Sequence, residues 1–192
     1  MKKAFFLCCV VSITILTGSL SAASQVKEEF DDLIFYIPNG LSITKTENSL
    51  SLRDSLLAND QNFSITINKS VVSLKKIEKS LPIFWRESLM NEGVDKPVAE
   101  PEFVKAQTTS GWNCFRGGKM VTYNDKVPPF YYHLIVLRYM GVTLKIITHA
   151  SSEELFFQKY PQLMQMVSVI NFKTPPNQTI QPGVSSNQNQ QQ

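Results

Sequence analysis

After residue 23 the sequence has one thiol, that of Cys114, and two imidazoles, those of His133 and His149, which together could carry nucleophilic and acid–base chemistry. A thiolate becomes a catalytic nucleophile where positive charge lowers its pKa and an imidazole lies within hydrogen-bond reach. Arg116 follows Cys114 by two residues, and residues two apart on a strand share a face. His149 is predicted to end a neighbouring strand, next to a helix start. Such an arrangement would indicate a secreted thiol-dependent enzyme, whereas a free cysteine is more commonly a small buried hydrophobic residue.

The sequence does not contain a known catalytic or metal-binding motif. The sequence has no HxH, HExxH or CxxC spacing, no GxSxG elbow and no GxGxxG turn. Gly117-Gly118-Lys119 is too short to be a phosphate loop. Zinc takes three or four ligands, which here would have to be assembled from His133, His149 and Glu153 without a suitable spacing. We therefore predict a non-catalytic protein without metal or cofactor.

A group of aromatic residues is the second candidate site. These residues are expected to cluster around one edge of a sheet and the Pro128-Pro129 loop. Strand alternation directs neighbouring residues to opposite faces, so core packing should account for most of the group. Those left at the surface could line a groove for a partner. The six candidate partner-binding residues are Trp112, Phe115, Tyr123, Phe130, Tyr131 and Tyr132.

The first 23 residues have the pattern of a secretory signal peptide. A positive start at Lys2 and Lys3 precedes an apolar run over 5–16 and a stretch of small residues. Ser21 and Ala23 provide the small side chains that signal cleavage requires, so cleavage is predicted after Ala23. The apolar run is shorter than the ~20 residues of a membrane-spanning helix. We therefore predict export and no transmembrane segment in the mature chain, with a retained anchor helix as the alternative.

Cleavage would change the charge and cysteine balance. Without Lys2 and Lys3, the 19 Lys and Arg residues become 17, against 16 Asp and Glu residues. Because no basic cluster stands out, nucleic acid is not expected as a partner. Cys114 would be the single remaining cysteine, so no internal disulfide can form and stability must come from a hydrophobic core. This balance favours a bacterial protein that is periplasmic or secreted.

Periodicity predicts short strands and one helix in the first half of the domain. The acidic segment 25–32 is expected to be a loop or a short helix. Apolar residues repeat at helical spacing within 73–91, but Pro82 is tolerated only in a first turn, so the helix should begin near Ser80 after a separate turn. Gly93 should end it. Strands are predicted over 33–37, 41–44, 50–53, 63–68, 103–109 and 112–123, the last with a bulge or close backbone approach at Gly117-Gly118.

The segment 130–172 is predicted to be a strand, a tight turn, a strand and a helix that packs back over the pair. Residues 130–139 are β-branched and aromatic without clean alternation, which is typical of a strand covered on both faces. Met140-Gly141 should form the turn. Ser151 and Glu154 fit a capping box at the helix start. Pro161 should kink the helix or divide it in two.

The predicted fold is α+β, with an antiparallel sheet packed with two main helices. We divide the chain into a signal peptide (1–23), a lead-in segment (24–32), a single domain (33–172) and a tail (173–192). The tail consists of Pro, Asn, Gln and Ser with little else. It has almost no apolar area to offset its ordering entropy, so it should be disordered. We favour a solvated tail over a flexible tether.

The order of these elements resembles the PsbP/DcrB-like group of small α/β/α sandwich proteins. The resemblance rests on the opening Ile-Pro-Asn-Gly turn, the stretch Arg-Tyr-Met-Gly-Val-Thr-Leu-Lys-Ile-Ile-Thr-His-Ala-Ser-Ser-Glu-Glu, and the closing Ser-Val-Ile-Asn-Phe. It covers roughly residues 34–172. The group is similar in fold to photosystem assembly and extrinsic subunits, to a nuclear Ran-binding protein and to bacterial envelope proteins, so the resemblance implies a binding role without a transferable active site. The combined prediction is an exported, non-catalytic protein that binds or helps assemble an envelope partner.

Overall fold

Two antiparallel sheets form the framework of the computed structural model, which describes residues 25–58, 60–73, 76–94, 98–123 and 128–174. The predicted signal peptide and residues 175–192 of the predicted tail lie outside the described residues. Within the described residues, the larger sheet has the strand order β3-β4-β5-β10-β9-β8-β7, and the short β6 pairs with β10. The bounds are β3 Leu41–Lys45, β4 Ser49–Asp54, β5 Phe63–Asn68, β6 Val71–Val72, β7 Val104–Gln107, β8 Asn113–Val121, β9 Phe130–Tyr139 and β10 Val142–Ala150. The smaller sheet has the order β1-β2-β11, with β1 Gln25–Phe30, β2 Leu33–Pro38 and β11 Asn171–Phe172.

The β9–β10 hairpin lies at the centre of the larger sheet, as the sequence predicts. The two strands pair continuously from Val142 opposite Tyr139 to Ala150 opposite Tyr131. Met140 and Gly141 make the turn with φ values of 47° and 84°. Residues 131–137 are all buried, because both faces of β9 are covered. This hairpin therefore separates the protein into two packing layers.

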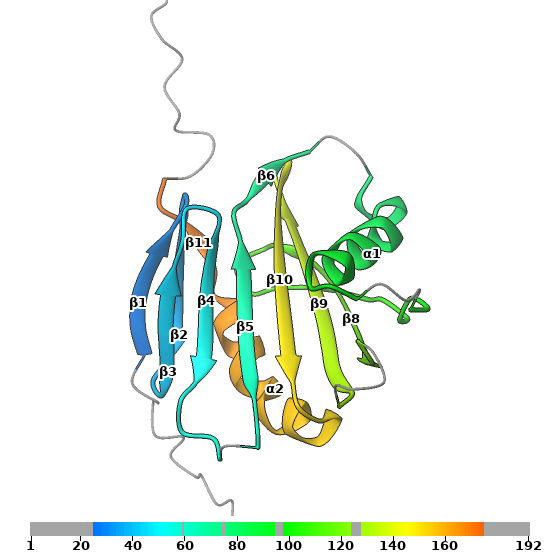
Figure 1. The fold of residues 1–192 in the computed structure, drawn as a ribbon. Helices are drawn as coiled ribbons and strands as arrows, with labels where there is room; N and C mark the ends of the chain where they lie inside the picture. The colour runs from blue at the N-terminus through cyan, green and yellow to red at the C-terminus, as the bar shows by residue number, and fades with distance from the viewer. Residues whose placement is uncertain (1–24, 59, 74–75, 95–97, 124–127, 175–192) are drawn as a thin grey trace, which may run out of the picture.

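Two helices cover opposite faces of the larger sheet, which confirms the predicted fold class (Figure 1). Helix α1, Leu81–Asn91, follows the short 3-10 helix η1, Ile77–Lys79, and carries Pro82 in its first turn as predicted. It packs Trp85 and Leu89 against even-numbered residues of β9. Helix α2, Glu153–Ser168, and the smaller sheet cover the other face. The layers are thus α1, the larger sheet, and α2 with the smaller sheet.

Several local predictions are wrong, each for a physical reason. The segment predicted as a loop or helix is strand β1, because pairing with β2 outweighs its polar composition. The N-cap of α2 is Ser152, whose hydroxyl accepts a hydrogen bond from the Leu155 N–H at 3.1 Å. Ser151 instead accepts one from the Asn62 N–H. Helix α2 is not divided in two at Pro161: it continues as one helix to Ser168, since its apolar face is held against the sheet on both sides of the proline.

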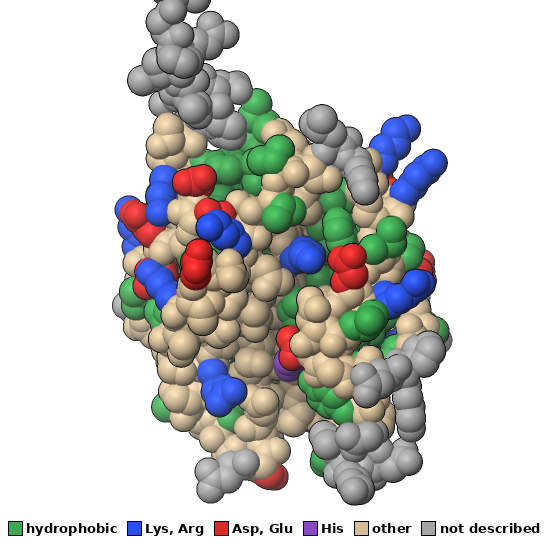
Figure 2. All heavy atoms as spheres, turned by 45° about the horizontal axis from the view of Figure 1, so that its top comes forward, with side chains coloured by type: hydrophobic (Ala, Val, Ile, Leu, Met, Phe, Trp, Pro, Cys, Tyr) green, Lys and Arg blue, Asp and Glu red, His purple; other side chains and the backbone are tan. Residues whose placement is uncertain are grey.

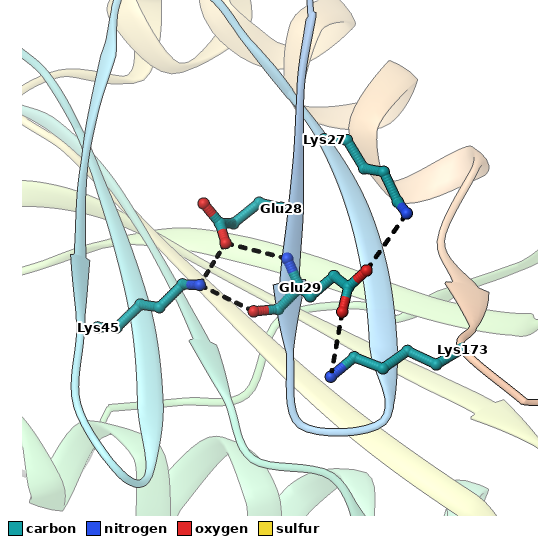
Figure 3. Close-up of polar contacts among 5 residues, drawn as sticks. All are labelled: Lys27, Glu28, Glu29, Lys45 and Lys173. Atoms are coloured by element: carbon teal, nitrogen blue, oxygen red, sulfur yellow. Dashed lines mark hydrogen bonds and ion pairs between the residues drawn. The ribbon is translucent and has the colours of Figure 1, made fainter.

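Ion pairs at the surface connect the smaller sheet to the edge of the larger one (Figure 3). Lys45, which ends β3, contacts the Glu28 carboxylate and donates to the Glu29 carbonyl at 2.9 Å. The Glu29 carboxylate lies 3.2 Å from Lys27 Nζ and 3.7 Å from Lys173 Nζ. Exposed ion pairs contribute only about 0–1 kcal/mol each. The network therefore fixes the position of β1 beside β3 more than it stabilises the fold.

Gly118 in β8 should not tolerate a larger side chain. The pairing of β8 with β9 is continuous through it, so there is no bulge. A Cβ there would lie 2.8 Å from both His133 Cδ2 and Tyr131 Cε1. We expect Gly118→Ala to lower the free energy of unfolding by about 1–3 kcal/mol through overpacking, measured by urea denaturation. The exposed neighbour Lys119→Ala is the control and should change stability by less than about 0.5 kcal/mol; an equal loss in both would contradict the explanation.

Candidate functional site

The six aromatic residues predicted to bind a partner lie in different environments. The side chains of Trp112, Phe115, Tyr131 and Tyr132 are buried. Tyr123 and Phe130 are half-buried and reach the surface. Only these two are therefore placed to touch a partner directly, and partner binding stays a prediction for them.

The structure does not bring all six aromatic residues together. Trp112 lies at the far end of β9 from Phe130, where its ring stacks on Phe172 at a centroid distance of 5.1 Å. Its indole N–H donates to the Ile170 carbonyl at 3.1 Å. Tyr131 faces α2 and packs against Phe156 at 4.5 Å. Trp112 and Tyr131 therefore belong to the hydrophobic core. The length of the strand separates Trp112 from Tyr123 and Phe130, and the alternation of side chains places Tyr131 on the other face of the sheet.

A compact aromatic cluster remains on the α1 face of the sheet. Tyr123 and Phe130 stack with a centroid distance of 4.6 Å. Phe130 also lies 5.4 Å from the His149 ring, and Tyr132 lies 4.9 Å from it. Trp85 of α1 packs edge-on against Tyr132 at 5.3 Å. We call these five residues the α1-face cluster.

Glu92 borders this cluster and carries an unusual carboxylate. It is the C-cap residue of α1, and its side chain is half-buried. No hydrogen bond or ion pair to its carboxylate occurs among the described residues. Burial therefore raises the pKa of Glu92, and its negative charge contributes to the raised pKa of Tyr123 after the larger effect of burial. A partly desolvated, unpaired carboxylate favours a cation beside it.

Polar atoms inside the α1-face cluster also lack partners. The indole N–H of Trp85, the hydroxyl of Tyr132 and Nε2 of His149 are buried, and none makes a hydrogen bond to a described residue. Buried polar groups are usually paired, so three unpaired ones in one cluster mark an atypical interior. Figure 2 shows a histidine side chain at the bottom of a hollow on this face, bordered by an acidic side chain and by hydrophobic side chains.

Sequence reasoning missed the contribution of helix α1 to this site. Neither Trp85 nor Glu92 is among the six aromatic residues that the sequence offers as partner-binding candidates. The positions 85, 89 and 92 have the four- and three-residue spacing that places side chains along one side of a helix. That spacing could have placed Glu92 beside Trp85, but the packing of α1 over β9 arises only in the folded chain.

The proposed thiol site is not assembled. Cys114 faces α2, and it is only 1% exposed. His149 faces α1, because its cross-strand neighbour is Tyr132. His133 shares the face of Cys114 but pairs with Gly118, four residues further along β8, which is about 13 Å away at the strand rise. Burial raises the pKa of the Cys114 thiol, with only partial compensation from the Arg116 charge.

The two histidines do not come together to form a zinc site with Glu153. His133 lies opposite Thr148, so it and His149 project from opposite faces of the sheet. Among the described residues, no group of three or more His, Cys, Asp or Glu side chains is close enough to hold a metal ion. None of the helices in these residues is long and apolar enough to cross a membrane.

Comparison with solved structures gives the same architecture at low sequence identity. The Ran-binding protein Mog1p of Saccharomyces cerevisiae matches 78% of this chain and 96% of its own, with a TM-score of 0.53 and 12% identity. Cyanobacterial PsbP (CyanoP) from Synechocystis matches 81% and 96%, with a TM-score of 0.52 and 17% identity. A protein from Bacteroides thetaiotaomicron matches 79% of this chain and 49% of its own, with a TM-score of 0.52 and 11% identity.

The chain therefore has the fold shared by PsbP and Mog1, as its resemblance to the PsbP/DcrB-like group predicted. No protein-family model and no curated protein matches the sequence. The likeness shows the fold, and the site must be judged on its own residues.

Cys114 should resist modification in the native protein. Because it is buried and its thiol pKa is raised, little thiolate is available at neutral pH. We expect alkylation of Cys114 to be at least about a hundredfold slower in buffer than in denaturing urea, since reaction requires opening of the structure. Peptide mapping by mass spectrometry would separate Cys114 from Cys8 and Cys9. Alkylation faster than that of a free thiol would revive the enzyme hypothesis.

Stability should fall as pH falls through the range in which histidine normally titrates. Burial lowers the pKa of His149 to about 4, so the folded chain keeps a neutral imidazole while the unfolded chain takes up a proton below about pH 6.5. Part of the stability present at pH 7.5 is therefore lost at pH 5. Replacing His149 with Gln should reduce that loss by about 1–2 kcal/mol. Urea denaturation at pH 7.5 and pH 5 gives the change in the free energy of unfolding for the wild type and for His149→Gln. An equal loss of stability in the two proteins would contradict the prediction.

Proposed function

We propose that this chain is an exported, non-catalytic protein that binds an envelope partner through Tyr123, Phe130 and Glu92. The observation that carries the proposal is the stacked, half-buried pair of Tyr123 and Phe130 beside an unpaired, half-buried carboxylate. Aromatic anchors of this kind contribute much of the binding energy at protein interfaces. The export part of the proposal is supported by the signal-peptide pattern of residues 1–23.

The charge and aromatic character of this surface define the chemistry of the partner. A Lys or Arg side chain placed at Glu92 would compensate the unpaired carboxylate. It would also lie beside aromatic rings that attract a cation through their π-electrons. Such a contact restores to Glu92 the charge stabilisation that burial removes. The proposed partner therefore presents a basic residue flanked by apolar ones.

The outer side of α1 supplies apolar area next to this surface. Ile83 is 52% exposed and Met90 is 65% exposed. They are seven residues apart, so they lie along the same side of the helix. Arg86 and Glu87 are exposed between them. A surface of isolated apolar residues among charges is typical of non-obligate interfaces, which form and dissociate.

The non-catalytic part of the proposal is supported by the separation of Cys114 from both histidines. One protein with this fold, Mog1p, is a Ran-binding protein, which also supports a binding role. A fold that hosts binding in one protein is a reasonable scaffold for binding in another, while the partner is set by the site.

Substitutions at this surface should weaken partner capture without unfolding the protein. Cross-linking in intact cells followed by mass spectrometry would identify envelope proteins held by the wild type. We expect Tyr123→Ala and Glu92→Gln each to weaken binding of that partner by about tenfold, in line with the loss of an interface anchor. Tyr36→Ala is the matched control, because Tyr36 is an exposed tyrosine of β2 in the smaller sheet.

Two results would contradict the proposal. One is recovery of no envelope protein above the background of a strain without the chain. The other is equal weakening by Tyr36→Ala and Tyr123→Ala, which would place the interface elsewhere or show that binding is non-specific. Thermal denaturation of each variant would separate a lost contact from a lost fold.

A further inference from the structure

We infer that the partner bound at Glu92 is a second copy of this chain, which presents its Arg116. The inference rests on the proposed function, since it names the partner for the surface formed by Tyr123, Phe130 and Glu92. That partner must present a basic residue flanked by apolar ones. Arg116 meets this description, because it is a half-buried cation of β8 that contacts the aromatic and apolar side of α2.

The Arg116 guanidinium has no carboxylate partner among the described residues. It donates a weak hydrogen bond to Met164 Sδ at 3.8 Å, and its central carbon lies 5.7 Å from the centroid of the Tyr160 ring. Its charge acts on a neutral neighbour instead: burial is the larger cause of the lowered pKa of His133, and Arg116 lowers that pKa further. A partly desolvated guanidinium without a counter-ion favours a carboxylate, which it can bind through two parallel hydrogen bonds.

Exposed apolar side chains surround this guanidinium. Helix α2 packs over β2, β9 and β10, so the same face of β7 and β8 extends past the helix. Val104, which lies opposite Arg116 in β7, is 52% exposed. Met120 of β8 is 41% exposed and Phe157 of α2 is 55% exposed, and both lie beside Tyr131. The Arg116 surface consists of Val104, Arg116, Met120, Phe157, Tyr160 and Met164.

The Arg116 surface and the Glu92 surface are complementary. One has a half-buried cation beside Tyr160, and the other has a half-buried carboxylate beside the stacked Tyr123 and Phe130. Joining them would pair two charges that lack a partner among the described residues, and the surrounding apolar side chains would exclude water from the pair. Because α1 and α2 cover opposite faces of the sheet (Figure 1), the contact must join the α1 face of one copy to the α2 face of the next. Such a head-to-tail contact extends into a ring or a chain of copies.

Self-association through these two surfaces should be weak and reversible. Stable interfaces bury about 1,200–2,000 Å², and each surface here offers only a few exposed apolar side chains. We therefore expect a Kd on the order of 100 μM. Net charge does not oppose the contact, because after the predicted cleavage 17 Lys and Arg residues face 16 Asp and Glu residues, so copies repel one another little.

The experiment is sedimentation equilibrium of the purified chain at concentrations up to about 1 mM, which detects association in the micromolar to millimolar range. We expect the mean mass to rise with concentration past that of two copies, since a head-to-tail contact leaves a free surface at each end. Glu92→Gln and Arg116→Gln should each weaken association about tenfold. Arg53→Gln is the matched control, because Arg53 is an exposed arginine of β4, on the far side of the larger sheet from β8.

A mixture of the two variants tests the pairing itself. In an equimolar mixture, Arg116 of the Glu92→Gln copy can bind Glu92 of the Arg116→Gln copy, so pairs should form that do not extend further. Met120→Glu provides a test that leaves Arg116 in place. Met120 is exposed on the same face of β8, so the new carboxylate would compete for the Arg116 guanidinium and should also weaken association. Thermal denaturation of each variant separates a lost contact from a lost fold.

Three results would overturn the inference: a chain that stays monomeric up to about 1 mM, a mixture that associates no better than its separate components, or equal weakening by Arg53→Gln and Arg116→Gln. Association that the mixture restores and Arg53→Gln leaves unchanged supports it. The proposed function fails independently of this result. A monomeric chain that still captures another envelope protein through Glu92 would overturn self-association alone, and it would leave the binding surface in place.

Discussion

Burial of strand β9 on both faces is the constraint on which the rest of the structure depends. Its even-numbered side chains pack beneath α1 and its odd-numbered side chains beneath α2. Because neighbouring strands keep the same register, the alternation extends across β8 and β10. Every side chain of the central sheet is therefore assigned to one of two layers, and residues close in sequence are separated by the thickness of the sheet.

This division explains why the residues with reactive side chains do not form a catalytic centre. Cys114 and His133 lie in the α2 layer, while His149 lies in the α1 layer. The imidazoles are kept neutral by burial, which lowers the pKa of His133 to about 3 and that of His149 to about 4. Neutral, desolvated imidazoles and a protonated thiol stabilise a core, but they are poorly suited to acid–base chemistry at neutral pH.

The α1 face carries the features that suggest binding, and its two ends have opposite character. One end has the aromatic pair of Tyr123 and Phe130 with the unpaired carboxylate of Glu92. The other has a pocket lined, among the described residues, by Lys76, Lys105, Arg138 and the acidic Glu78. A single small domain can thus offer two surfaces of different charge on one side.

The sequence by itself determined the central hairpin, its turn at Met140-Gly141 and the late start of α1 behind Ser80. These depend on local sterics and on periodicity, which a few neighbouring residues specify. It also determined that Tyr131 and Tyr132 must face opposite ways. Only the tertiary structure decided that β1 is a strand, that α2 continues through Pro161, and that Glu92 lies beside Tyr123. Those features arise from contacts between segments distant in the chain, whose packing outweighs local preference.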